Sequence, residues 1–165
     1  MSREGPGSGD SAWHNLARDN LDWDNLDWER ATASAFQSLI GYRLVLWERD
    51  RAVIEYDMDP AHLNRSGLLH GGVIATLLDT ASGYAGCWCP VPGRIRRTLT
   101  LSLTTNFLAP VQHGRVRVEG RRTGGGRTVF FTTAEAHDDE GRVVATAAGT
   151  FRYLPGSGDE QGVLR

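Results

Sequence analysis

The sequence predicts an α+β fold in which a long antiparallel sheet packs on one central helix. Residues 71–85 are almost all glycine, alanine and larger apolar residues, a composition typical of a buried helix. The second half of the chain instead carries four segments rich in β-branched and aromatic residues. Turn-forming residues separate these segments at hairpin spacing, so we expect the strands to follow one another as a meander.

The segments before the central helix predict one further helix and one hairpin. Residues 29–40 are expected to be helical, with apolar residues on one face and Gly41 as the C-cap. Two strand-like segments, 42–47 and 52–56, flank a polar turn at 48–51 and indicate a β-hairpin. The four later strands are expected at 95–108, 115–122, 128–137 and 143–153.

The length of 165 residues fits a single domain, which we place at residues 29–155. A flexible acidic arm (1–28) is expected before it and a loose tail (156–165) after it. The arm contains the sequence Asp-Asn-Leu-Asp-Trp twice, ending at Trp23 and at Trp28. These tryptophans either pack on the surface of the domain or bind a partner, in which case the arm would be an interaction module.

Composition narrows the class of protein. The net charge is −2 and the pI about 6.2, so no basic field indicates nucleic acid. No apolar run reaches the roughly 18 residues of a membrane span, and the N-terminus does not resemble a signal peptide, so we expect a cytoplasmic protein. The two cysteines, Cys87 and Cys89, are too few for a disulfide framework or a zinc site, and no metal or cofactor is expected.

Asp79 is the most informative residue because it lies within the apolar helix segment. A carboxylate is rarely buried without a partner. One interpretation is a structural aspartate that bonds a neighbour such as Thr80. The other is a general base or nucleophile whose pKa is tuned by its apolar surroundings.

The sequence His70-Gly71-Gly72 stands where the central helix begins. The first N–H groups of a helix lack internal acceptors and lie at the positive end of its dipole. Such an end can polarise a carbonyl and stabilise the oxyanion that forms when the carbonyl is attacked. Alternatively, the glycines serve only a tight turn into the helix.

Helical geometry separates these two features. His70 and Asp79 are nine residues apart, which is roughly 13 Å along a helix and about 180° around it. One chain therefore cannot apply both to the same carbonyl. In a two-fold dimer with antiparallel helices, the start of one helix would face the aspartate of the other, and the second subunit would cover the remaining apolar side of the helix.

Three parts of the sequence resemble one family. They are Asn64-x-x-Gly67-x-x-His70-Gly71-Gly72 followed by Asp79, the stretch Thr100–Pro110 with Gly114, and Gly126-Arg127-Thr128. The pattern resembles hot-dog-fold thioesterases of the phenylacetate-pathway (PaaI) type, over roughly residues 30–153. The acidic arm is outside that pattern.

The resemblance implies a hot-dog fold and hydrolysis of an acyl-CoA, with an aromatic or medium-chain acyl group, to the free acid and CoA. Asp79 would be the general base or nucleophile, and the Gly71 amide of the opposite subunit would polarise the thioester carbonyl. A homodimer would be required for the site, and two dimers would pair into a homotetramer.

Three further positions follow from the same resemblance. His70 and Asn64 would lie beside the Gly71 amide and orient the thioester or the water. Thr100 would help to place the water near the aspartate. Thr98 and Ser102 are alternatives of the same type, because the strand register decides which hydroxyl faces the helix.

Arginines near two turns are candidates to bind the phosphates of CoA. Alternatively, they are ordinary exposed side chains. The candidates are Arg94, Arg96, Arg97, Arg121, Arg122 and Arg127.

Other functions remain open. A non-catalytic acyl-thioester binding protein, or a dehydratase or hydratase of the same fold, would share much of this pattern. The sequence lacks the G-x-S-x-G motif of α/β-hydrolases and any P-loop or dinucleotide fingerprint.

Overall fold

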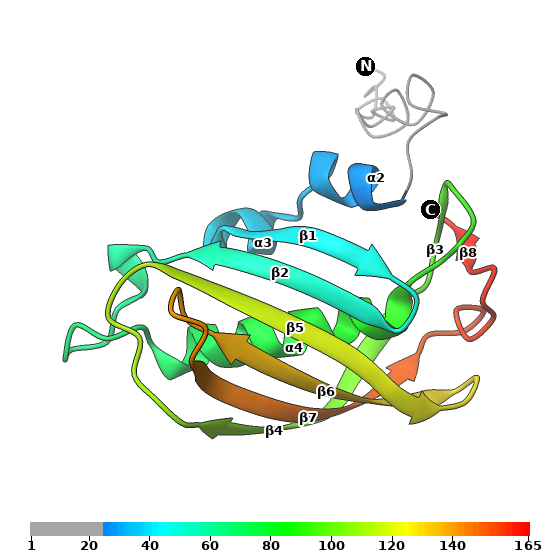
Figure 1. Cartoon of the computed structure of the whole chain (residues 1–165). Coiled ribbons are helices and arrows are strands. Elements are labelled where there is room, and N and C mark those ends of the chain that lie inside the picture. Colours follow the sequence, from blue (N-terminus) through cyan, green and yellow to red (C-terminus); the bar gives the residue numbers. More distant parts are fainter. Residues whose placement is uncertain (1–24) are drawn as a thin grey trace, which may run out of the picture.

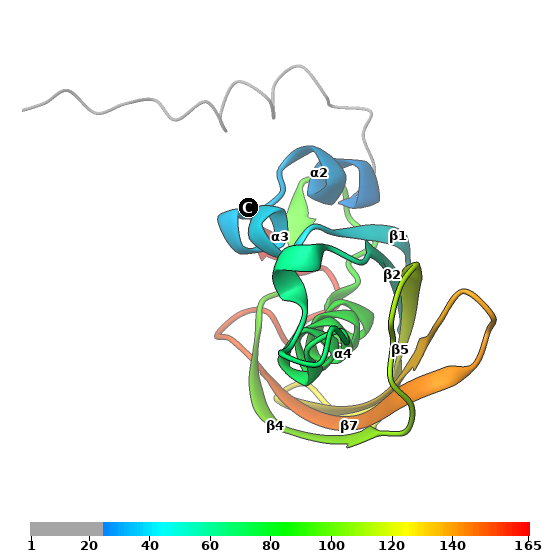
Figure 2. The same ribbon diagram turned by 90° about the vertical axis from the view of Figure 1, so that its left-hand side faces the viewer.

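Helix α4 (Gly71–Cys87) crosses one face of a curved antiparallel sheet in a computed structural model that describes residues 25–165 (Figure 1). The sheet curls around the helix from its first strand to its last (Figure 2). This arrangement confirms the predicted α+β fold. The six strands are β1 (Tyr42–Glu48), β2 (Arg51–Asp57), β4 (Thr98–Phe107), β5 (Arg115–Gly125), β6 (Val129–His137) and β7 (Val143–Tyr153).

The expected meander of the last four strands is wrong. The strand order is β1-β2-β5-β6-β7-β4, so only β5, β6 and β7 follow one another in space. Strand β5 bonds to β2 on one side and to β6 on the other, which leaves no place beside it for β4. Strand β4 pairs with β7 instead and forms an edge of the sheet.

One face of α4 forms the core with the sheet. Ile74, Leu77, Leu78 and Ala81 are buried there. Gly120 of β5 allows the helix to come close, since a Cβ at that position would lie 2.3 Å from the Ala81 carbonyl oxygen. The opposite side is not fully covered by residues 25–165, and a stripe of partly exposed residues runs along it: Val73, Thr76, Asp79, Thr80 and Gly83.

Two short helices replace the single helix expected at 29–40. They are α2 (Asn25–Ala31) and α3 (Ala35–Ile40). The break occurs because Ser34 caps a new helix, accepting a hydrogen bond from the Gln37 N–H. Gly41 ends α3 in the left-handed conformation, as expected. The expected apolar face is also wrong, because Phe36 and Leu39 are exposed.

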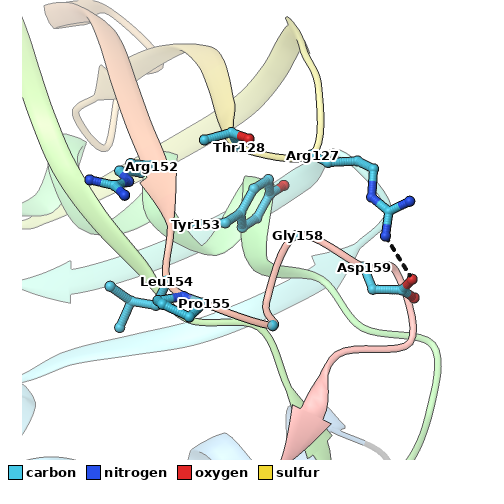
Figure 3. A pocket seen from close by; sticks show the side chains of 9 residues that line it. Arg127, Thr128, Arg152, Tyr153, Leu154, Pro155, Gly158 and Asp159 are labelled. Atoms are coloured by element: carbon cyan, nitrogen blue, oxygen red, sulfur yellow. Dashed lines mark hydrogen bonds and ion pairs between the residues drawn. The ribbon is translucent and has the colours of Figure 1, made fainter.

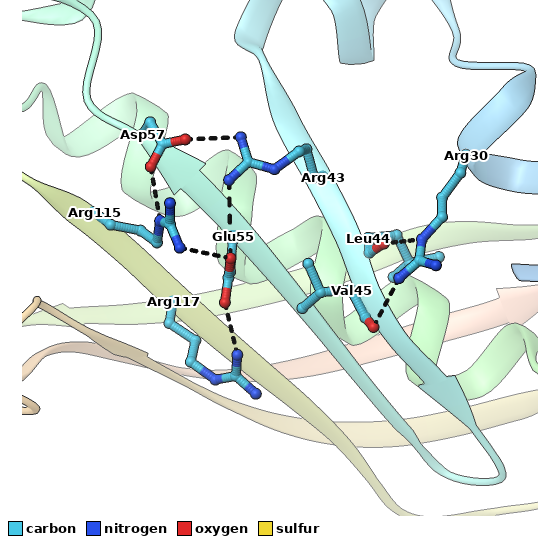
Figure 4. A network of polar contacts seen from close by, with 8 residues as sticks. All are labelled: Arg30, Arg43, Leu44, Val45, Glu55, Asp57, Arg115 and Arg117. Atoms are coloured by element: carbon cyan, nitrogen blue, oxygen red, sulfur yellow. Dashed lines mark hydrogen bonds and ion pairs between the residues drawn. The ribbon is translucent and has the colours of Figure 1, made fainter. Parts of the chain in front are cut away.

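The two edges of the sheet differ. At the β1 edge, Arg30 of α2 donates from Nε to the Leu44 carbonyl and from Nη2 to the Val45 carbonyl, both at 3.0 Å (Figure 4). Those carbonyls are thereby occupied and α2 blocks this edge. The β4 edge has no neighbouring strand in the described part of the chain, and three of its large apolar side chains are more than half exposed: Leu99, Leu101 and Phe107.

Both ends of the described chain pack on the domain. Asn25, expected in the flexible arm, is buried and donates to the Cys89 carbonyl. The tail is not loose, because β8 (Val163–Leu164) pairs with β3 (Arg94–Ile95). Arg165 forms an ion pair of 2.9 Å with Glu29 of α2. Trp28 lies in α2, with the Arg165 guanidinium 3.8 Å from the centre of its ring, whereas residues 1–24, including Trp23, lie outside the described residues.

Candidate active site

Asp79 lies midway along α4 with its carboxylate partly buried and turned toward β4. The Thr100 hydroxyl donates a hydrogen bond of 2.9 Å to Asp79 Oδ1. Burial raises the pKa of Asp79 above its ordinary value, and the Thr100 hydrogen bond partly opposes that rise. The carboxylate is therefore a stronger base than an exposed aspartate, as a general base requires.

A β-bulge decides which hydroxyl of β4 meets the aspartate. Thr100 pairs with Phe151, whose buried side chain faces the helix, but Ser102 pairs with Thr150 on the other face. The register shift leaves Leu101 as the extra residue and reverses the alternation of side chains. Thr100 therefore lies at Asp79, and Ser102 does not.

His70 is the N-cap of α4. Its Nδ1 atom accepts a hydrogen bond of 2.9 Å from the Gly72 N–H, and its carbonyl accepts from the Val73 N–H. Within the described chain the Gly71 N–H has no acceptor, so it is left free at the positive end of the helix. The imidazole thus shapes the helix start and leaves one donor available.

Asn64 shapes the loop that leads to α4. Its Oδ1 atom accepts hydrogen bonds from the Ser66 N–H (2.8 Å) and the Leu68 N–H (3.2 Å). Gly67, with φ of 73°, allows the chain to reverse there. The side-chain oxygen of Asn64 is thus already hydrogen-bonded within its own loop.

Gly71 and Asp79 remain apart in one chain. They are eight residue steps apart on one continuous helix, roughly 12 Å along the axis. One subunit therefore carries the Asp79 carboxylate with its Thr100 partner at one place on α4. It carries the free Gly71 N–H at another place.

Arg96 does not fit the expected phosphate-binding set. It is buried, and its guanidinium donates to the carbonyls of Ser157 (3.1 Å), Trp88 (3.4 Å) and Gly158 (3.5 Å). The guanidinium also lies 4.3 Å from the centre of the Tyr153 ring. These contacts interrupt the strand expected at 95–108 and make Arg96 a structural cation that holds the C-terminal segment.

The other candidate arginines are scattered. Arg121 pairs with Glu119, and Arg122 pairs with Asp50 at 3.1 Å. Arg94 donates to the Gln161 carbonyl at 3.3 Å, and Arg97 is exposed. Only one of the set, Arg127, lines a hollow near the β4–β7 end of the sheet.

That hollow has a volume of about 300 Å³ and lies where β7 ends (Figure 3). Arg127 and Thr128 border it from the β5–β6 turn, and Arg152 borders it from β7. Arg127 is 81% exposed and makes a long contact of 3.5 Å with Asp159. Arg152 was missed in the sequence, although alternation along β7 places it on the outer face beside that turn.

Residues 25–165 contain neither a candidate metal site nor a candidate membrane-spanning helix. No cluster of three or more histidine, cysteine, aspartate or glutamate side chains there could hold a metal ion. No helix in that part of the chain is both long and apolar enough to cross a membrane.

Comparison with known proteins identifies the family. Residues 66–145 match the family described as the thioesterase superfamily. The protein named "Putative esterase SSO2140" of Saccharolobus solfataricus is 30% identical over 112 residues, covering 68% of this chain and 78% of that protein. The chain therefore belongs to the thioesterase superfamily, with the hot-dog fold of its PaaI-type members.

The chain is also similar to one further relative in sequence and to one solved structure in fold. The medium/long-chain acyl-CoA thioesterase YigI of Escherichia coli is 25% identical over 129 residues, covering 70% of this chain and 83% of YigI. The PaaI protein from the phenylacetic acid degradation operon of E. coli has a TM-score of 0.69 at 22% identity. That structural match covers 80% of this chain and 96% of PaaI and supports the fold.

The raised pKa of Asp79 predicts an effect on stability. The protonated form is favoured by folding, so this carboxyl stabilises the fold at low pH, and that contribution is lost as the pH rises through its folded pKa. Asp79→Asn should therefore raise the free energy of unfolding modestly at pH 7, because the amide carries no charge for burial to disfavour and solvent reaches part of the site. The gain should shrink as the pH falls through the raised pKa of Asp79 and be nearly absent below pH 3.8, the ordinary pKa of aspartate.

Urea denaturation at both pH values measures this effect. Glu140→Gln, in an exposed turn, is the matched control and should leave stability nearly unchanged. A loss of stability on Asp79→Asn at pH 7 would contradict the assigned cause.

Proposed function

We propose that this protein hydrolyses an acyl-CoA thioester, with an aromatic or medium-chain acyl group, to the free acid and CoA. The observation that carries the proposal is that α4 presents both a partly buried, hydrogen-bonded carboxylate at Asp79 and a free N–H at Gly71. A base and an oxyanion donor are the two groups that acyl transfer to water needs. YigI, a relative named as an acyl-CoA thioesterase, favours CoA as the carrier.

The proposed site is shared between two subunits. Pairing of two β4 strands across their open edges would cover Leu99 and Leu101 and satisfy the free backbone groups. If the strands pair antiparallel, the two α4 helices also run antiparallel along their uncovered stripes. The Gly71 end of one helix then faces Asp79 of the other. A tetramer of two such dimers, and residence in the cytoplasm, remain parts of the proposal that only solution experiments address.

In the proposed reaction, the Gly71 N–H of one subunit donates to the thioester oxygen and polarises the carbonyl. Asp79 of the other subunit either removes a proton from the attacking water or attacks the carbonyl carbon itself. Thr100 holds the carboxylate oxygen and is placed to orient the water. The tetrahedral intermediate then collapses, the C–S bond breaks, and CoA leaves as a thiolate. If Asp79 acted as the base, the thiolate takes up the proton that Asp79 removed from water. If Asp79 attacked the carbon itself, water then hydrolyses the resulting acyl–Asp79 anhydride, which releases the acid, restores the carboxylate and supplies the proton to the thiolate.

His70 and Asn64 contribute indirectly in this proposal. His70 fixes the first turn of α4, and Asn64 fixes the loop before it. Both hold the Gly71 N–H in place rather than touching the substrate.

The hollow between Arg127 and Arg152 is the proposed site for the phosphates of CoA. In the strand register Arg152 pairs with Leu99, the residue before Thr100, so the hollow and Asp79 are at the same end of β4. Two cations that are not held in close ion pairs can donate to phosphate oxygens.

Replacement of Asp79 tests the reaction. Asp79→Ala and Asp79→Asn should lower kcat about 10²- to 10⁴-fold, the usual contribution of a general base. Release of free thiol from a panel of aromatic and aliphatic acyl-CoAs measures turnover, and Glu140→Gln is the control for a lost negative charge. Full turnover by the Asp79 variants would overturn the mechanism.

The same panel separates the rival functions. A wild-type protein that binds acyl-CoAs at equilibrium but releases no thiol is a non-catalytic binding protein. Loss or gain of water across an acyl double bond, with the thioester intact, would identify a dehydratase or hydratase instead.

Replacement of the two arginines tests the carrier. Arg127→Ala and Arg152→Ala should each raise KM for acyl-CoA roughly 3- to 10-fold with little change in kcat, since exposed charged contacts are modest. Acyl-pantetheine, which lacks the nucleotide, should show no such difference. Arg117→Ala, on the outer face of β5 and paired with Glu55, is the matched control. Equal effects on KM for both substrates would show that Arg127 and Arg152 do not bind the phosphates of CoA.

A further inference from the structure

His62 links the buried sheet to the start of α4 through its ring and its backbone. The ring lies against Tyr56 of β2, where the Tyr56 hydroxyl is 2.8 Å from His62 Nδ1. The His62 carbonyl accepts a hydrogen bond of 3.0 Å from the N–H of His70, the residue directly before Gly71. One residue therefore connects the core strand with the N-cap of the helix.

The direction of the ring hydrogen bond follows from the other contact of Tyr56. The Tyr56 oxygen accepts a hydrogen bond of 3.0 Å from the Asp59 N–H. Tyr56 is only 1% exposed, so its own hydrogen needs an acceptor inside the protein. His62 Nδ1 is that acceptor, which requires the neutral ring to carry its hydrogen on Nε2.

The loop between these points is held along its length. A short 3-10 turn (Pro60–His62) is capped by Asp59, whose Oδ1 accepts from the Ala61 N–H at 2.8 Å. Beyond it, Leu63 forms an isolated bridge with Leu69. The loop therefore has few ways to move unless the Tyr56–His62 contact breaks.

We infer that Tyr56 and His62 are positioning residues, whose partly buried hydrogen bond fixes the loop so that the Gly71 N–H is held where a thioester carbonyl must lie. This inference rests on the proposed function, in which Gly71 is the oxyanion donor. Neither side chain touches the substrate. The expected loss on breaking the bond is in kcat, because a misplaced catalytic group costs transition-state stabilisation.

The test compares three single variants. Tyr56→Phe removes the donor, and His62→Leu removes the acceptor. His62→Asn keeps an acceptor oxygen close to the position of Nδ1. The first two should lower kcat about 10-fold or more with KM changed less than about twofold, whereas His62→Asn should recover most of kcat. His113→Leu, an exposed histidine outside the loop, is the matched control.

The double variant Tyr56→Phe/His62→Leu separates one shared bond from two independent effects. If both residues act through that bond, the double variant should be no slower than the worse single variant. Multiplied losses, or an unchanged kcat in both single variants, would overturn the inference. Val118→Ala in the core controls for lost stability alone and should keep its kcat at a temperature where it is folded.

Hydrogen exchange gives a readout that does not depend on activity. Exchange of the His70 N–H, which bonds to the His62 carbonyl, should be faster in Tyr56→Phe and His62→Leu and near wild type in His62→Asn. If exchange follows this order but wild type hydrolyses no acyl-CoA, the proposed function fails while the loop link stands. Unchanged exchange at His70 in all variants would overturn the link itself.

Discussion

Gly71 and Asp79 lie on one rigid helix, and their separation along it constrains the rest of the proposed site. Helix α4 runs unbroken from Gly71 to Cys87, so the free N–H at its start cannot approach the carboxylate in its middle. In the proposed reaction, each group therefore needs a counterpart from another chain. Features that seem unrelated within one subunit, such as the uncovered stripe on α4, then become parts of a shared site.

The unequal edges of the sheet fit that requirement. Arg30 occupies carbonyls of β1 and closes one edge, whereas β4 keeps a long apolar edge open. β4 also carries Thr100, the partner of Asp79. In the proposed dimer, the strand that pairs the two subunits is therefore also the strand that donates a hydrogen bond to Asp79, so assembly and chemistry would depend on the same element. The paired charges on the other half of the sheet, around Glu55 and Asp57, suit contact with water (Figure 4).

Local patterns in the sequence predicted most elements, because apolar periodicity and turn residues act over a few positions. The hairpin at 42–56 and the helix from 71 were predicted for that reason. The position of β4 beside β7 could not be predicted, since it depends on which strand already flanks β5. The bulge at Leu101 also left no signal in the sequence. Without it, the sequence could not show whether the Thr100 or the Ser102 hydroxyl faces the helix. Arg96 shows the same limit. An arginine near a turn suggested a phosphate-binding side chain, but Arg96 is buried and donates to backbone carbonyls instead.

Activity of mixed dimers tests the shared site most directly. One parent carries Gly71→Val and the other Asp79→Ala, and each should be inactive alone. After exchange at equal amounts, half of the dimers are mixed, and each mixed dimer has one intact site with Gly71 and Asp79 from different chains. We predict recovery of about one quarter of wild-type activity, as two-fold symmetry requires. Exchange of subunits, shown by mass spectrometry, without any return of activity would contradict the account.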